Sequence, residues 1–267
     1  MQKATTIISA VIVFALLQEV DAKEKELFLS AAGGLSYATL QDRNFSAMPY
    51  SGFSWLTSLR LTTETASYLD DLSVFFRNGR LDMGIISGTA DQKTTFIGGN
   101  IHYTHVRKLN PDQMAKRQFF LGGNFNSSAG FYKRSHYGDN YYYVYKSSVG
   151  PSFVFRQPLT GNGRLQIDGR AGLSIVSYVI YPSYGSNMPE NKLDKPLSDI
   201  TAWDYISGGK ILALNRFQQI NCTTNLTYRL YKKVSLGLTY DWDFFHLKRG
   251  DDLIQAIHNA YFSILFH

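Results

Sequence analysis

The sequence predicts an all-β protein, an antiparallel up-and-down transmembrane β-barrel of about ten strands. Three observations lead to this prediction. Aromatic residues make up 15% of the chain and charged residues only 18%, whereas soluble domains carry about 25% charged residues. After the N-terminus the chain has no run of about 20 apolar residues, so transmembrane helices are not expected. Instead, apolar and polar residues alternate, which is typical of strands with one face toward lipid and the other toward a polar interior.

Residues 1–22 have the layout of a secretory signal peptide. An apolar core covers 7–17 after a basic start, and small residues precede a cleavage site. This core is too short to cross a membrane. We therefore expect cleavage between Ala22 and Lys23, which leaves a barrel domain of 23–267. The alternative is an uncleaved N-terminal anchor helix.

The alternation is clearest in 234–245. One face there is apolar (Val234, Leu236, Leu238, Tyr240, Trp242, Phe244) and the other is polar or small (Ser235, Gly237, Thr239, Asp241, Asp243). No helical period fits these residues as well. In 164–181 the same pattern predicts an apolar face of Leu165, Ile167, Ala171, Leu173, Ile175 and Val179.

A soluble β-sandwich also alternates, and it is the main alternative fold. The segments here are longer than the roughly 5–6 residues of a typical soluble strand, and aromatic residues gather toward segment ends, as they do at membrane interfaces. The hydrophilic faces also carry many charges, which a dry sandwich core would not accept. We therefore expect seven polar residues to line a barrel lumen: Arg164, Asp168, Arg170, Asn225, Arg229, Asp241 and Asp243.

Ten segments are expected to form strands, and ten is an even number, as a closed single-chain bacterial barrel needs. They are 26–41, 53–65, 69–86, 93–107, 116–132, 141–156, 164–181, 214–230, 233–246 and 254–267. The alternative is twelve strands, because Asn78-Gly79 is a strong hairpin signal and 198–212 could supply a further strand. The longest connection, 182–213, contains several prolines and glycines and is expected to be a loop.

The C-terminal segment 258–267 carries a family resemblance. Ala260, Phe262, Ile264 and Phe266 alternate with polar or smaller residues. The segment resembles the assembly signal of bacterial outer-membrane β-barrel proteins, a final amphipathic strand with a terminal aromatic residue. It departs from that pattern because Phe266 is penultimate and His267 follows it. The resemblance implies an integral protein surrounded by outer-membrane lipids and lipopolysaccharide, and it names no activity.

Some small outer-membrane barrels are enzymes, namely phospholipases, lipid A-modifying enzymes and omptin proteases, and these need a nucleophile or activated water with a base. The histidines offer weak candidates. His102 is expected to be a hydrogen-bonding group in the lumen, His136 lies in a solvated loop beside Ser135 and Asp139, and His246 is expected at the membrane interface.

Asp241 and Asp243 share a lumen face and could act as acid and base, but the more economical interpretation is that they pair with Arg229 or Arg170 across the lumen. Cys222 is the only cysteine, so neither an internal disulfide nor a cysteine-built zinc site is expected. We assign no catalytic residue, metal or cofactor.

Two classes of function remain open. The first is a non-enzymatic barrel, acting as a narrow pore, a surface-exposed binding protein or a component of a membrane assembly, with protein partners reached through 182–213. The second is an enzyme with a site at the barrel rim that acts on lipid or peptide. A barrel of about ten strands has a lumen largely filled by side chains, which argues against a general-diffusion porin. The net charge of +6 is scattered along the chain, so nucleic-acid binding is not expected.

Overall fold

The computed structural model describes residues 26–42, 49–83, 93–109, 117–134, 140–181, 208–248 and 252–267. These residues form strands and turns only, and none of them belongs to a helix long and apolar enough to span a membrane. The strands are β1 (Glu26–Asp42), β2 (Tyr50–Glu64), β3 (Tyr68–Met83), β4 (Lys93–Lys108), β5 (Gln118–Arg134), β6 (Asn140–Pro158), β7 (Leu165–Leu173), β8 (Val176–Ile180), β9 (Lys210–Ala213), β10 (Phe217–Tyr231), β11 (Val234–Leu247) and β12 (Leu253–Phe266). The signal-peptide prediction falls on residues outside the described ranges.

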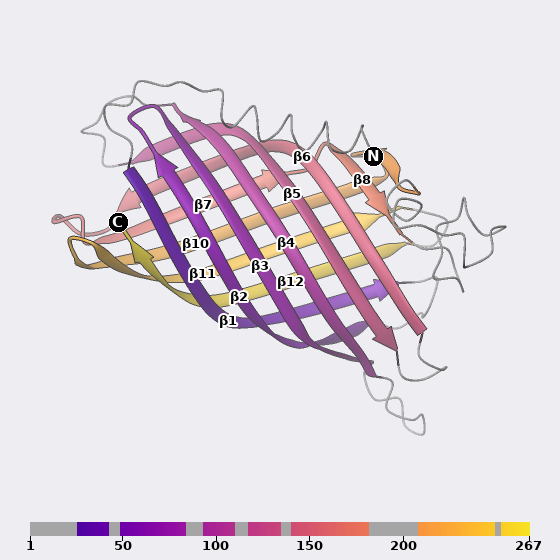
Figure 1. The fold of residues 1–267 in the computed structure, drawn as a ribbon. Coiled ribbons are helices and arrows are strands. Elements are labelled where there is room, and N and C mark those ends of the chain that lie inside the picture. Colours follow the sequence, from indigo (N-terminus) through magenta and orange to yellow (C-terminus); the bar gives the residue numbers. More distant parts are fainter. Residues whose placement is uncertain are drawn as a thin grey trace, which may run out of the picture.

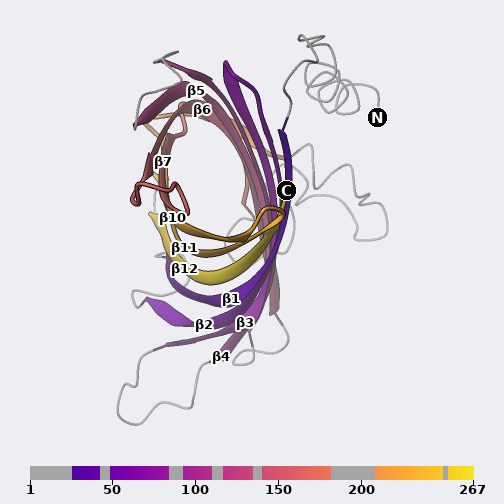
Figure 2. The ribbon, with the colours of Figure 1, turned by 90° about the vertical axis from the view of Figure 1, so that its left-hand side faces the viewer.

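The strands close into an antiparallel barrel (Figures 1 and 2). Each long strand pairs with its neighbour in the chain, and β12 returns to pair with β1, so that Leu35 lies opposite Ala260. One end of the barrel, the turn end, holds the connections 65–67, 159–164 and 232–233. The opposite end, the loop end, is where β1 leads toward β2 and β11 toward β12.

Ten strands make up the wall, as the sequence predicts, because β8 and β9 continue β7 and β10 rather than adding to the circumference. β7 pairs with residues 152–158 of β6, whereas β8 pairs with residues 145–149 of the same strand. β9, which lies within the expected loop 182–213, pairs with β8. The interruptions fall at 174–175 and 214–216.

The predicted alternative of a hairpin at Asn78-Gly79 is wrong. β3 runs through both residues, and they pair in register with Trp55 and Ser54 of β2. Gly79 serves a close approach instead, because a Cβ atom there would lie 2.2 Å from the Cβ atom of Ser54. The glycine that does shape a turn is Gly163, whose φ of 66° falls in the left-handed region between β6 and β7.

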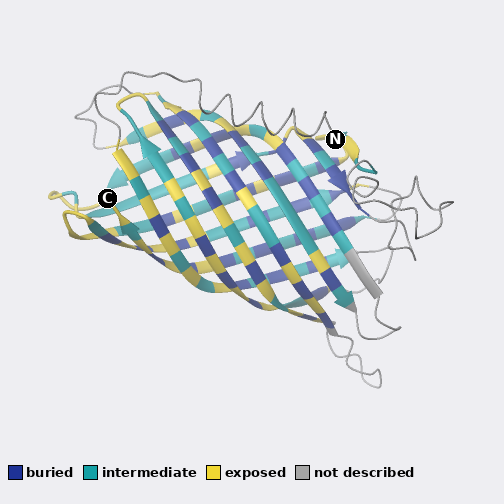
Figure 3. Ribbon diagram, in the orientation of Figure 1, coloured by how far each residue is buried: buried dark blue, intermediate teal, exposed yellow. Residues whose placement is uncertain are grey.

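Buried and more exposed residues alternate along the strands of the barrel (Figure 3), and many of the exposed side chains of the wall are large and apolar. The most exposed apolar side chains of the wall include Trp55 (74%) and Phe262 (72%). Phe119, Phe153 and Phe155 pack together near the turn end, with ring centroids 5.4–6.1 Å apart. A continuous exposed apolar wall of this kind requires a hydrocarbon environment.

The prediction for Val179 is wrong. Val179 faces the interior and is 5% exposed, although Ile175 faces outward as expected. The chain bulges where β7 ends, and both Ile175 and Val176 point outward, at 49% and 43% exposure. The extra residue reverses the inside-outside alternation for all of β8.

Candidate functional site in the barrel lumen

The lumen contains most of the polar residues that the sequence singles out. Asp168, Arg170, Asn225, Asp241 and Asp243 project inward from β7, β10 and β11. Arg164 and Arg229 lie instead at the mouth of the turn end, where both are exposed. Most contacts across the lumen are made by charged residues that the sequence analysis did not single out, namely Arg60, Glu64, Asp71, Lys146 and Arg156.

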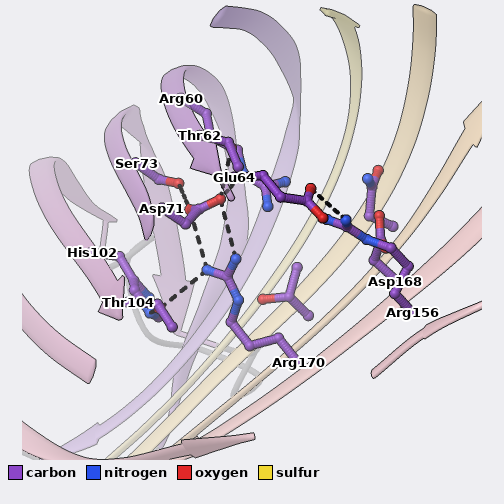
Figure 4. Close-up of polar contacts among 12 residues, drawn as sticks. Arg60, Thr62, Glu64, Asp71, Ser73, His102, Thr104, Arg156, Asp168 and Arg170 are labelled. Carbon is purple, nitrogen blue, oxygen red and sulfur yellow. Dashed lines mark hydrogen bonds and ion pairs between the residues drawn. The ribbon is translucent and has the colours of Figure 1, made fainter. Parts of the chain in front are cut away.

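The centre of the lumen is built around Asp71 of β3, whose side chain is completely buried (Figure 4). Arg60 of β2 and Arg170 of β7 both bind its carboxylate, the latter with an Nη2–Oδ2 distance of 3.2 Å. The hydroxyl groups of Thr62 and Ser73 donate to the same carboxylate at 2.9 and 3.0 Å. Asp71 thus ties one wall of the barrel to the opposite one through Arg170.

His102 of β4 belongs to the same network. Its side chain is buried, and Nε2 lies 3.0 Å from Oγ1 of Thr104, which in turn accepts a bond from Arg170 at 3.3 Å. The side chain is therefore a hydrogen-bonding group of the lumen, as the sequence suggests, and the hydroxyl beside its ring, that of Thr104, is completely buried.

A second cross-link, also drawn in Figure 4, lies nearer the turn end, because it includes Glu64, the last residue of β2 before the turn 65–67. Arg156 of β6 donates to Glu64 of β2 at 2.6 Å and to Asp168 of β7 at 2.8 Å. Gln166 adds a bond to Asp168 at 2.9 Å. One guanidinium therefore bridges the carboxylates of two different strands, and its planar fork suits such paired binding.

A third cross-link lies toward the loop end. Lys146 of β6 reaches Asp243 of β11 with an Nζ–Oδ2 distance of 3.1 Å, and both side chains are about 95% buried. Gln219 donates to the other oxygen of Asp243 at 2.8 Å. The ammonium also lies 3.9 Å from the ring centroid of Phe245. A buried ion pair needs such additional contacts to offset the cost of removing both charges from water.

The expected partners of the two aspartates are therefore wrong. Arg170 binds Asp71 rather than Asp241 or Asp243, and Arg229 lies at the mouth. Asp241 accepts bonds from neutral donors, Thr223 and Asn259, both at 2.8 Å. Cross-lumen partners depend on how the ten strands are staggered around the barrel, which the alternation of a single strand does not contain.

Beyond these cross-links, the loop end of the lumen is filled by apolar side chains. We call this group the loop-end cluster: Ala38, Leu40, Tyr50, Leu81, Phe96, Tyr132, Val144, Val179, Tyr181, Phe217, Phe245, Leu247, Leu253 and Ile257. Phe217 and Phe245 stack at 5.8 Å, and Phe96 and Tyr132 at 5.7 Å. Gln255 donates to the hydroxyl of Tyr132 at 3.1 Å and links β12 to β5 inside the cluster.

The open space within the lumen lies toward the turn end, away from the loop-end cluster. A cavity of about 470 Å³, which we call the turn-end vestibule, is lined among others by Arg60, Arg156, Arg164 and Arg229. A smaller cavity of about 30 Å³, room for a single water, continues from it past Arg60 and Arg156 toward Asp241. The vestibule is therefore open at the turn end and blocked by the Asp71 network farther in.

Three contacts of histidine rings in the described part of the chain have residue types that could support catalysis. The clearest nucleophile–base contact joins Oγ of Ser235 to Nε2 of His267 at 2.7 Å. Ser235 is only 1% exposed, although Ser235 and His267 both line the turn-end vestibule, and among the described residues no carboxylate is hydrogen-bonded to His267 to complete a triad. His246 lies 3.4 Å from Asp252 near the loop end, and His105 and Tyr103 share Asp70 on the outer surface at 2.8 Å. Within the described ranges no three His, Cys, Asp or Glu side chains gather as a metal site would require.

No protein-family model matches the sequence, and no curated protein matches it. Among solved structures, the fold is similar to that of the outer membrane protease OmpT from Escherichia coli, with a TM-score of 0.58 over 93% of this chain and 99% of that chain, at 7% identity. The translocator domain of the autotransporter NalP from Neisseria meningitidis aligns with a TM-score of 0.39 at 9% identity, over 100% of this chain and 97% of that one. Neisserial surface protein A aligns with a TM-score of 0.35 at 8% identity, over 91% and 99%. The apolar outer wall, the closed antiparallel sheet and the similarity to OmpT lead to one conclusion: the chain has the fold of bacterial outer-membrane β-barrel proteins.

Proposed function

We propose that this protein is a non-enzymatic integral protein of the bacterial outer membrane, whose barrel is a closed anchor and whose binding contacts are made at its two ends. The observation that carries the proposal is the filled lumen. Three ion-pair cross-links, centred on Asp71, Arg156 and Asp243, span the interior at successive depths. The loop-end cluster adds an apolar barrier in series with them.

Each barrier by itself opposes the passage of a hydrated solute. Breaking a buried ion pair leaves an uncompensated charge and costs about 3–5 kcal/mol. The loop-end cluster is mostly apolar and offers water few polar partners, and hydrated ions do not cross such a constriction readily. Together they favour an anchor over the narrow pore, which remains the alternative within the non-enzymatic class.

The partners follow from the position of the barrel in the membrane. Outer-membrane lipids and lipopolysaccharide would surround the apolar wall, and protein partners would bind at 182–213. Of that segment the described part begins at residue 208. The rim-site enzyme is not favoured by a specific contact among the described residues, since no described carboxylate is hydrogen-bonded to His267 beside Ser235, and the described ion pair of His246 is with Asp252.

Conductance tests the proposal directly. We expect proteoliposomes that contain the purified protein to retain small ions, and planar bilayers to show no steady open channel. Flotation of the vesicles and heat-modifiable gel migration would establish that the barrel is inserted and folded. A steady conductance from the folded wild-type protein would show that the barrel is a pore, and turnover of phospholipid, lipopolysaccharide or peptide by the same sample would show that it is an enzyme.

A further inference from the structure

The turn-end vestibule has the form of a binding pocket rather than of a passage. Its volume of about 470 Å³ falls within the range of small-molecule sites, roughly 300–1,000 Å³. It is open at the turn end, and its inner end is closed by Arg60 and Arg170 on the buried Asp71. A molecule that enters from the turn end therefore stops inside the barrel.

Two of the four arginines that line the vestibule take no part in the ion pairs of its described residues, while the single charge of Arg156 is shared by two carboxylates. Arg156 holds both Glu64 and Asp168, and Arg60 is held by Asp71. Arg164 and Arg229 also line the cavity, and in the described part of the chain neither forms an ion pair. The third acidic residue of the lining, Glu26, begins β1, whereas the two arginines belong to the side of the mouth formed by β7 and β10.

These two arginines are neighbours. The backbone N–H of Arg229 donates to the backbone carbonyl of Arg164 at 2.8 Å. The two residues therefore lie beside each other on adjacent segments of the chain. Two adjacent guanidinium groups, each with several donors, match the oxygens of a carboxylate or phosphate. On β5, two strands from β7 around the wall, Oε1 of Gln118 is buried without a described donor and could accept a hydrogen bond from a hydroxyl group.

From the blind cavity and these two arginines we propose that the turn-end vestibule binds a small ligand that carries a carboxylate or a phosphate, with its anionic group on Arg164 and Arg229. Outer-membrane barrels place their short turns in the periplasm and their longer loops outside the cell. In that orientation this pocket opens toward the periplasm, so the ligand is a soluble or tethered molecule of that compartment. The closed lumen lets the barrel hold the ligand without transporting it.

Isothermal titration calorimetry of the full-length protein in a neutral detergent tests this binding, with citrate and inorganic phosphate as probes and glycerol as an uncharged comparison. We expect at least one anion to bind saturably and glycerol not to bind. Arg164→Gln and Arg229→Gln should each weaken the binding by about tenfold, the loss of one charge-assisted contact. The matched control is Lys232→Gln, because Lys232 is a cation of the adjacent turn that does not line the cavity, and it should change the affinity less than about twofold.

The proposal is wrong if neither anion binds saturably, or if Lys232→Gln weakens binding as much as Arg229→Gln does. A preference for citrate or for phosphate would identify the anionic group of the natural ligand. This test is independent of the conductance test, because a barrel that conducts ions could still bind the anion, and a closed barrel could fail to bind it.

Discussion

At the scale of single residues, Asp70 and Asp71 show how strongly the two faces of one strand differ. Asp71 faces the lumen and holds two arginines, whereas Asp70 faces outward, where the hydroxyl of Tyr103 and the ring of His105 contact it. The buried carboxylate stabilises the barrel only because its charge is compensated, and the two arginines depend on it in the same way.

Replacing Asp71 by asparagine should therefore destabilise the barrel strongly. Asp71→Asn leaves Arg60 and Arg170 in the lumen without their shared carboxylate, and we expect the free energy of unfolding to fall by about 3–5 kcal/mol. Urea unfolding in lipid vesicles, followed by tryptophan fluorescence, measures this change. The control is Asp82→Asn, since Asp82 pairs with Arg80 on the exposed surface at 3.0 Å and should contribute less than about 1 kcal/mol. Equal losses from both variants would contradict the role given to Asp71.

At the scale of strands, the alternation of side chains predicts the wall well and its irregularities poorly. All ten wall strands lie where the period of two places them, because a strand between lipid and lumen must alternate. The bulge before β8 was not predictable: Ser174 and Ser177 are polar, Ile175 and Val176 are apolar, and either of the apolar residues could be the additional one. The partners of Arg170 and Asp243 were missed for a different reason, since they depend on contacts between strands that are distant in the sequence.

The assigned faces of β10 can be tested with two adjacent residues. Leu226 faces outward opposite Leu238 of β11, and Thr227 lines the turn-end vestibule. Leu226→Arg should lower the free energy of unfolding by about 2–4 kcal/mol, because it places a charge against hydrocarbon. Thr227→Arg should cost much less, because the vestibule has room for a solvated side chain. Unfolding titrations in vesicles compare the two, and a larger loss from Thr227→Arg would mean that the faces are reversed.

At the scale of the whole molecule, a narrow polar lumen was predictable but its closure was not. The sequence indicates charged inward faces, yet whether these charges line water or bind one another depends on pairs such as Lys146 and Asp243, which are 97 residues apart. The residues of the loop-end cluster face inward but are apolar, whereas polar residues were expected on that face. Cleavage before Lys23 remains a prediction, because the structure describes the chain from residue 26 onward.

Because β1 pairs with β12, the order of the strands along the chain could be changed without the loss of a strand pair. Leu29 lies opposite Phe266, so the start of β1 and the end of β12 are adjacent at the turn end. A circular permutant that joins these two strands by a short linker and begins anew at the 232–233 turn should refold in detergent with the same heat-modifiable migration, because every strand pair of the wall can still form. The same permutant would carry β10, rather than β12, as its last strand. The C-terminal resemblance implies that the cellular insertion machinery recognises the final strand. In that case the permutant should fold in detergent but fail to insert into the membrane in cells. This result would show that the residues that determine the fold of the barrel differ from those that direct its insertion.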